Sequence, residues 1–167
     1  MKKIIFILII SILYIKPVSA QYSFSGTSDP NITVGTVLAM TMTAGTSYNI
    51  NFTTASQIAS GITVNNMNNF QVKSNMPWYL SVSAATPNFT GTGTYASANM
   101  PASVITVGVT GQTAVSLSTT NKTLIVGNRG SYTATGNSFS TNYTANPGFS
   151  YGPGNYSITI NYTLTYQ

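Results

Sequence analysis

Apolar and polar residues alternate with a period of two along several stretches of the chain. The longest such stretch covers 156–166, where Tyr, Ile and Leu at even positions alternate with Ser, Thr and Asn at odd positions. Successive side chains of a β-strand point to opposite faces, so this pattern predicts a strand that buries one face. Because its backbone groups need hydrogen-bond partners, we expect the strand to pair on at least one side.

Shorter segments repeat the alternation, and each is bounded by Gly, Asn or Pro residues that favour turns. The predicted strands cover 47–53, 70–74, 78–83, 105–109, 115–117 and 123–126. Seven apolar side chains are expected to point into one interior: Phe70, Val72, Trp78, Leu80, Val82, Ile158 and Ile160. Trp78, the only tryptophan, lies on the alternating strand 78–83 and is expected to anchor the core. The alternative is that its ring is exposed and serves as a platform for sugar rings.

Short strands separated by turn residues, without a helical stretch after residue 20, predict an all-β fold. We expect 21–167 to form one domain, an antiparallel β-sandwich of immunoglobulin-like type, with an up-and-down barrel as the alternative. The many Ser, Thr and Asn residues also fit a disordered chain, but 43% hydrophobic residues and regular alternation argue against disorder.

The first twenty residues have the pattern of a secretory signal peptide. Lys2 and Lys3 precede an apolar run over 4–15, and the small residues of 18–20 offer a cleavage site. The alternative, a membrane anchor, would need about 20 apolar residues. We therefore expect a secreted protein at the cell surface, in the extracellular space or in the periplasm, without a membrane span after cleavage.

Charged and reactive residues are scarce enough to exclude most enzyme chemistry. Only 4% of the residues are charged, with six Lys+Arg, one Asp+Glu, no His and no Cys. The single carboxylate, Asp29, cannot form a general acid-base pair, and without His or Cys there is no catalytic triad, zinc site or disulfide. We expect no enzyme activity, no cofactor and no metal. Lys73, Lys122 and Arg129 are too dispersed to predict nucleic-acid binding.

Two motifs resemble the WxL family of bacterial cell-surface domains over 70–167. Trp78 and Leu80 match the first Trp-x-Leu motif; in the second, Gly154 precedes a strand in which Tyr162 stands in place of Trp, followed by Leu164. The resemblance implies a secreted β-sandwich that is held non-covalently on the cell surface.

The C-terminal strand also resembles that of chaperone-usher pilin subunits. Tyr166 occupies the penultimate position and Gly154 lies near the start of the strand, as in those subunits. This resemblance implies a subunit that assembles by β-strand donation. The disulfide usual in pilins is missing here, and 22–25 matches only part of their N-terminal donor segment.

Tyrosines outside the predicted core are candidates for a binding surface. The hypothesis is an exposed aromatic set that contacts polysaccharide, and the alternative is unrelated surface tyrosines. Its members are Tyr79, Tyr95, Tyr132, Tyr143 and Tyr151. The sequence thus predicts a secreted, non-enzymatic cell-surface protein of structural or adhesive type, or else a pilus-like subunit. The expected partners are cell-wall or extracellular polysaccharide, other surface proteins, or further copies of the chain.

Overall fold

A computed structural model describes residues 30–43 and 49–167 of the chain. The expected signal peptide, the segment 22–25 that resembles part of a pilin donor segment, Asp29 and Tyr48 lie outside the described residues. The chain divides into two units, Met1–Val34 and Gly35–Gln167. The described part of the first unit, 30–34, has no regular secondary structure, and every helix and strand below belongs to the second unit.

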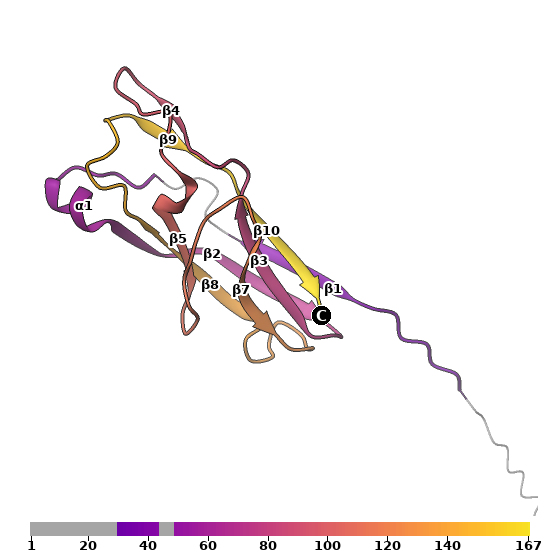
Figure 1. Cartoon of the computed structure of the whole chain (residues 1–167). Helices are drawn as coiled ribbons and strands as arrows, with labels where there is room; N and C mark the ends of the chain where they lie inside the picture. The colour runs from indigo at the N-terminus through magenta and orange to yellow at the C-terminus, as the bar shows by residue number, and fades with distance from the viewer. Residues whose placement is uncertain (1–29, 44–48) are drawn as a thin grey trace, which may run out of the picture. The chain divides into compact units, whose positions relative to one another are not determined.

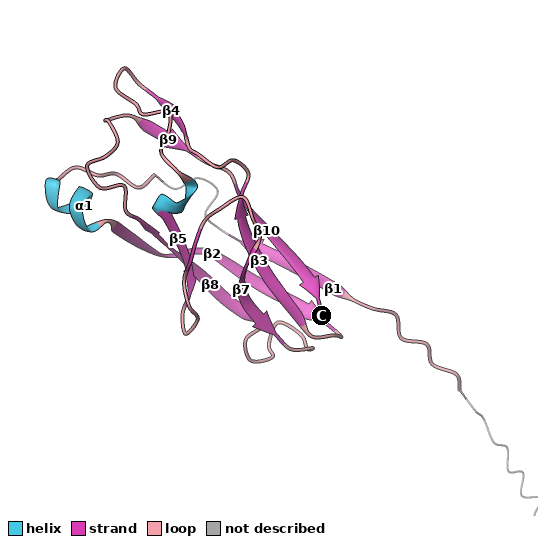
Figure 2. Ribbon diagram, in the orientation of Figure 1, coloured by secondary structure: helices cyan, strands magenta, loops and turns pink. Residues whose placement is uncertain are grey.

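The second unit consists mainly of antiparallel strands, which confirms the all-β prediction (Figure 2). In chain order its elements are β1 (Leu38–Thr43), α1 (Ala55–Ser60), β2 (Ile62–Ser74), β3 (Trp78–Ala84), β4 (Thr90–Thr92), the 3-10 turn η1 (Ala102–Val104), β5 (Ile105–Val109), β6 (Val115–Ser116), β7 (Lys122–Gly127), β8 (Ser138–Ala145), β9 (Asn155–Ser157) and β10 (Ile160–Tyr166). They form a five-stranded sheet in the order β1-β2-β8-β5-β6, a three-stranded sheet in the order β10-β3-β7, and a two-stranded ribbon of β4 and β9 (Figure 1).

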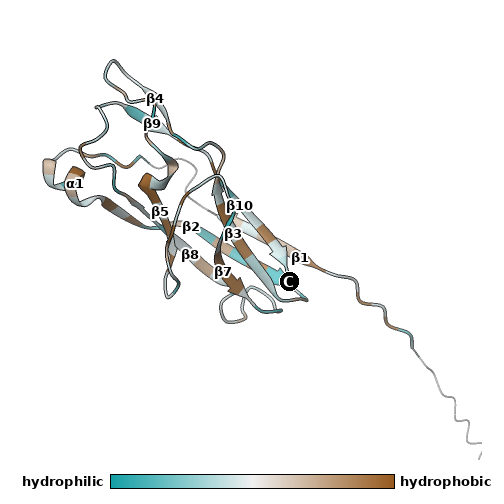
Figure 3. Cartoon of the chain, viewed as in Figure 1, coloured by the Kyte–Doolittle hydropathy of each residue, from teal (hydrophilic) through white to brown (hydrophobic). Residues whose placement is uncertain are grey.

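The two larger sheets contribute side chains to one hydrophobic core. Figure 3 shows hydrophobic segments, in brown, on strands of both sheets, and on β3 and β5 the apolar residues recur at every second position. Five of the seven predicted core residues are at most 1% exposed: Phe70, Val72, Trp78, Leu80 and Val82. The other two, Ile158 and Ile160, are half-buried and pack against the same core. The period-two pattern therefore predicted which face of these strands is buried.

The strand predicted over 47–53 is wrong for its described part. Residues 49–53 have no regular secondary structure, although Ile50 and Phe52 are half-buried against the core, as the alternation predicted. The segment is followed by α1, which Thr54 caps: its hydroxyl accepts from the Gln57 backbone N–H, and the Gln57 side chain accepts from the Thr54 N–H. No helix in the described parts of the chain is long and apolar enough to cross a membrane.

Besides β1, which no predicted strand covers, two stretches of strand in the five-stranded sheet were not predicted. β2 begins at Ile62, eight residues before the predicted start, and its pairing with β8 is interrupted between Val64 and Asn68, where Asn66 has a φ of 56°. β8 lies in the centre of the sheet, between β2 and β5. Its inward face includes the fully buried Thr141, so the strand lacks the apolar alternation by which the others were found.

The segment predicted as one strand over 156–166 forms two strands with different partners. β10 pairs with β3, and β9 pairs with β4. Between these pairings, residues 85–89 lie opposite only Ile158 and Thr159, so the longer segment bulges away from the shorter one. The β4–β9 ribbon therefore continues the β3–β10 pairing beyond the end of the three-stranded sheet (Figure 1).

Candidate functional site

The motif residues of the two Trp-x-Leu-like segments meet on neighbouring strands. β3 and β10 are antiparallel, and their register places Leu164 opposite Leu80 and Tyr166 opposite Trp78. Leu80 is fully buried, whereas Leu164 and Tyr162 are half-buried against the core. Tyr166, at the end of β10, is 54% exposed. Except for Tyr166, these side chains close the core and do not form a surface.

Trp78 has the environment of a core anchor. It is 0% exposed, and its ring stacks at 6.2 Å from that of Phe139 on the other sheet. The indole N–H donates to the Asn128 carbonyl at 3.0 Å, which satisfies its one polar group. Gly127 lies opposite Trp78 in the register, and a Cβ there would overlap the indole. The buried ring is unavailable as a platform for sugars.

The prediction that Tyr143 is exposed is wrong. Tyr143 is 9% exposed, and its hydroxyl shares a hydrogen bond of 2.6 Å with the Tyr162 hydroxyl between the two large sheets. The Asn68 amide also donates to the Tyr143 hydroxyl, at 3.0 Å. Its position on the inward face of β8 explains the burial. Burial raises the pKa of Tyr143 and that of Tyr162, because the ionised forms would lose their hydration.

The structure divides the other four candidate tyrosines among three places. Tyr79 is half-buried on β3, beside Val126 of β7 and Thr165 of β10. Tyr132 lies in the β7–β8 connection and is 42% exposed, with the Lys73 ammonium 5.1 Å from its ring centroid. Only Tyr95 and Tyr151 lie on adjoining loops, at the end of the β4–β9 ribbon.

These two loops, 93–99 and 146–154, are held together by one tyrosine hydroxyl. The Tyr156 hydroxyl accepts from the Ser97 backbone N–H at 2.9 Å and donates to the Gly152 carbonyl at 2.5 Å. The Gly152 N–H in turn donates to the Ser97 hydroxyl at 2.9 Å. A closed set of three hydrogen bonds therefore fixes one loop against the other.

Glycines make this close approach of the loops sterically feasible. A Cβ at Gly152 would overlap the Tyr95 carbonyl oxygen. At Gly154, the glycine of the second motif, a Cβ would come within 2.7 Å of the Ala96 Cβ and 2.9 Å of the Thr92 carbonyl oxygen. A larger residue at either position would separate the loops.

Three aromatic residues occupy the paired loops, and one of them, Phe149, was not among the predicted candidates. Tyr95 is 74% exposed, Phe149 is 70% exposed and Tyr151 is half-buried. The signal for Phe149 was present in the sequence, because an aromatic residue between the turn formers Pro147-Gly148 and Gly152-Pro153 is expected at the surface. We call the loops 93–99 and 146–154, with these three aromatic residues, the aromatic tip.

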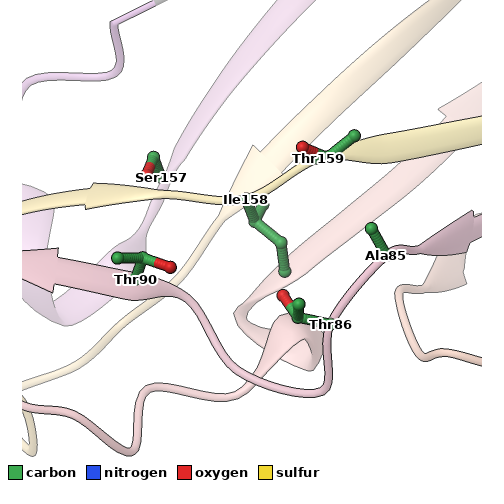
Figure 4. A pocket seen from close by; sticks show the side chains of 6 residues that line it. All are labelled: Ala85, Thr86, Thr90, Ser157, Ile158 and Thr159. Atoms are coloured by element: carbon green, nitrogen blue, oxygen red, sulfur yellow. The ribbon is translucent and has the colours of Figure 1, made fainter.

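A small pocket lies at the base of the same ribbon (Figure 4). It has a volume of about 180 Å³ and forms where the β3–β10 pairing is interrupted. Figure 4 shows the Ile158 side chain extending toward Thr86. The pocket is lined by Ala85, Thr86, Thr90, Ser157, Ile158 and Thr159. Four of these six side chains carry a hydroxyl, so the pocket offers hydrogen bonds but no charge.

Comparisons with protein-family models and with curated proteins find no match for the chain. The resemblances to WxL domains and to pilin subunits therefore rest on the motif residues alone and stay predictions.

Proposed function

We propose that the protein is an exported, non-enzymatic bacterial surface protein of adhesive or structural type. The observation that carries the proposal is the aromatic tip, in which hydrogen bonds hold together two loops that carry exposed aromatic rings at the end of the β4–β9 ribbon. Recognition sites commonly use this arrangement, since aromatic side chains on loops bring large contact areas with little conformational freedom to lose. The scarcity of acidic, His and Cys side chains supports a binding role over a catalytic one.

We also propose that the two larger sheets form an immunoglobulin-like sandwich. Contacts between them support it: the Phe70 ring on β2 lies 4.8 Å from the Tyr162 ring on β10, in addition to the Trp78–Phe139 stack. Sandwiches of this class carry loops at the ends of their sheets, where recognition surfaces are typically found. The aromatic tip has the corresponding position beyond the end of β3.

Localisation and adhesion can be tested together in the native host. Intact cells are treated with protease, and the protein is quantified in the surface, periplasmic, medium and cytoplasmic fractions. A strain lacking the protein is then compared with one that produces Tyr95→Ala/Phe149→Ala. We expect the protein outside the cytoplasm. We also expect cells of both strains to attach less to surfaces, or to other cells of the same strain, than cells of the parent strain do. A strictly cytoplasmic protein would contradict the proposal.

A pilus-like subunit is the second candidate, and the open strand edges support it. Among the described strands β10 pairs only with β3, and β1 pairs only with β2, so each leaves one side of its backbone unpaired. In the first unit, Ile32 and Val34 are 79% and 76% exposed and alternate with polar or small residues. An exposed alternating segment can add to an open edge of another copy.

Removing the candidate donor segments distinguishes the two functions. The sequence singles out 22–25, which removal of 21–26 deletes, and the exposure of Ile32 and Val34 adds 30–34. If the chain is a pilus-like subunit, deleting both segments should abolish polymers and leave the subunit folded. A chain that is monomeric before the deletion supports the adhesive protein. Polymers that survive the deletion would exclude donation by these segments.

A further inference from the structure

The aromatic tip combines exposed rings with a complete lack of charge. Neither of its loops contains an Asp, Glu, Lys or Arg residue, and the same holds for the whole of 88–101 and 146–159. The polar groups available there are hydroxyls, amides and backbone groups. Sugar rings present apolar C–H faces together with hydroxyls that donate and accept hydrogen bonds. From this match we infer that the aromatic tip binds a neutral polysaccharide. This inference rests on the proposed adhesive function and names the class of its ligand.

The placement of charge on the rest of the domain supports a neutral ligand. Within 30–43 and 49–167 the only charged side chains are Lys73, Lys122 and Arg129. Lys73 and Arg129 lie near the start of β3, where Ser74 bridges Gly130, whereas the aromatic tip follows the end of β3 (Figure 1). Lys122 lies opposite Val82, near the end of β3 and before the ribbon, where its ammonium donates to the Ser116 carbonyl at 2.9 Å. An anionic polysaccharide would therefore find no cation at the tip to offset the loss of its hydration.

The hydroxyl-lined pocket extends the same chemistry along the ribbon. Its residues Thr90 and Ser157 are the first pair of the β4–β9 ribbon, and Thr92 and Asn155 are the last pair before the tip. Two residue steps along a strand span roughly 7 Å. A chain-like ligand can thus contact both the rings and the hydroxyls, whereas an isolated small molecule would reach only one of them.

A protein partner fits the tip less well than a polysaccharide. About a quarter of the residues of an average protein are charged. Docking such a surface onto the uncharged tip would remove water from those charges without supplying counter-charges. A neutral polysaccharide carries no such cost, because its hydroxyls can bond to the backbone and hydroxyl groups of the tip.

Binding of the purified full-length protein to insoluble polysaccharides tests this inference. Cellulose, chitin and starch serve as neutral probes, alginate as the anionic probe, and depletion of the protein from solution gives the affinity. We expect the protein to bind at least one neutral polysaccharide, and we expect its affinity not to change with salt concentration. Tyr95→Ala and Phe149→Ala should each weaken binding about tenfold, as expected for anchor residues. Tyr132→Ala, an exposed tyrosine outside the tip, is the matched control and should bind as the parent does.

Several outcomes would overturn the inference. These are no binding to any neutral probe, binding to alginate only, or neutral binding that Tyr95→Ala and Phe149→Ala leave unchanged. A cell assay separates this failure from failure of the proposed function. If attachment depends on Tyr95 and Phe149 but is abolished by protease treatment of the target surface and survives periodate oxidation of its sugars, the partner is a protein. The adhesive function would then stand, and the neutral polysaccharide would be rejected.

Discussion

Replacing Trp78 is the sharpest test of how the core is built. Trp78→Ala removes the largest fully buried side chain, which contacts Phe139 on the opposite sheet and fills the space that Gly127 leaves open. Trp78→Phe keeps a ring in the same place but deletes the N–H that donates to the Asn128 carbonyl. The two variants therefore separate the contribution of buried volume from that of the hydrogen bond.

The expected magnitudes follow from this environment. Truncation of a fully buried tryptophan to alanine costs about 3–5 kcal/mol, because the cavity adds to the lost transfer free energy. We expect Trp78→Phe to cost about 1–2 kcal/mol, since a hydrogen bond contributes about 0.5–1.5 kcal/mol and a smaller ring loses some contact area. Domains have a total free energy of unfolding of about 5–15 kcal/mol, so Trp78→Ala threatens folding itself.

Urea denaturation followed by far-ultraviolet circular dichroism measures both losses. Tryptophan fluorescence cannot be used for the variants, because Trp78 is the only tryptophan. Tyr95→Ala is the control; at an exposed loop position it should change the free energy of unfolding by less than about 0.5 kcal/mol. A loss below about 1 kcal/mol for Trp78→Ala, or equal losses for the two Trp78 variants, would refute this account of the core.

Three further predictions concern the buried tyrosines and the C-terminal segment. Because burial raises the pKa of Tyr143 and Tyr162, the unfolded chain loses these protons first, and the free energy of unfolding should fall above about pH 10 by up to about 1.4 kcal/mol per pH unit for each tyrosine. We expect the free energy of unfolding, measured by urea denaturation at several alkaline pH values, to fall less steeply with pH for Tyr162→Phe than for the parent protein. An unchanged dependence on pH would contradict the raised pKa of Tyr162. Deleting 155–167 should leave the chain unfolded, and the corresponding peptide added in trans should restore circular dichroism; a folded deletion variant would show that the strand is dispensable. Tyr156→Phe should weaken polysaccharide binding with little loss of stability, whereas Leu164→Ala should lower stability and leave the affinity of the folded fraction unchanged.

Strands with an apolar side chain at every inward position could be predicted from the sequence. β3 and β5 are of this kind, and their predicted bounds differ from the observed bounds by at most one residue. β8 could not be found in this way, because the buried Thr141 interrupts its apolar face. α1 has only six residues and none of them is buried, so its clearest signal is the capping box between Thr54 and Gln57.

The division of the C-terminal segment shows what alternation cannot reveal. The period of two continues through Ile158 and Thr159 without a change, since it reports which face a side chain occupies and not which strand is the neighbour. The change of partner is imposed by the opposite segment, 85–89, which is three residues longer and contains Pro87. For the same reason the sequence grouped Tyr95 and Tyr151 with three other tyrosines in one candidate set and could not show which of the five lie together. Their meeting depends on the hydrogen bonds of Tyr156 and on the small size of Gly152.

This division also gives one continuous segment two separable roles. From Ile160 onward, the even-numbered side chains as far as Leu164 pack against the core, so substitutions there act mainly on the free energy of unfolding. Upstream, Tyr156 holds the two loops of the aromatic tip through its hydroxyl, and Gly154 permits the close contact with Ala96. Substitutions there change how the loops are arranged before a ligand arrives, which affects affinity through the cost of ordering the site. The interruption at 158–159 separates the two parts, because the β4–β9 ribbon has its own pairing and lies outside both larger sheets. The surface of the aromatic tip can therefore vary without loss of the core that supports it.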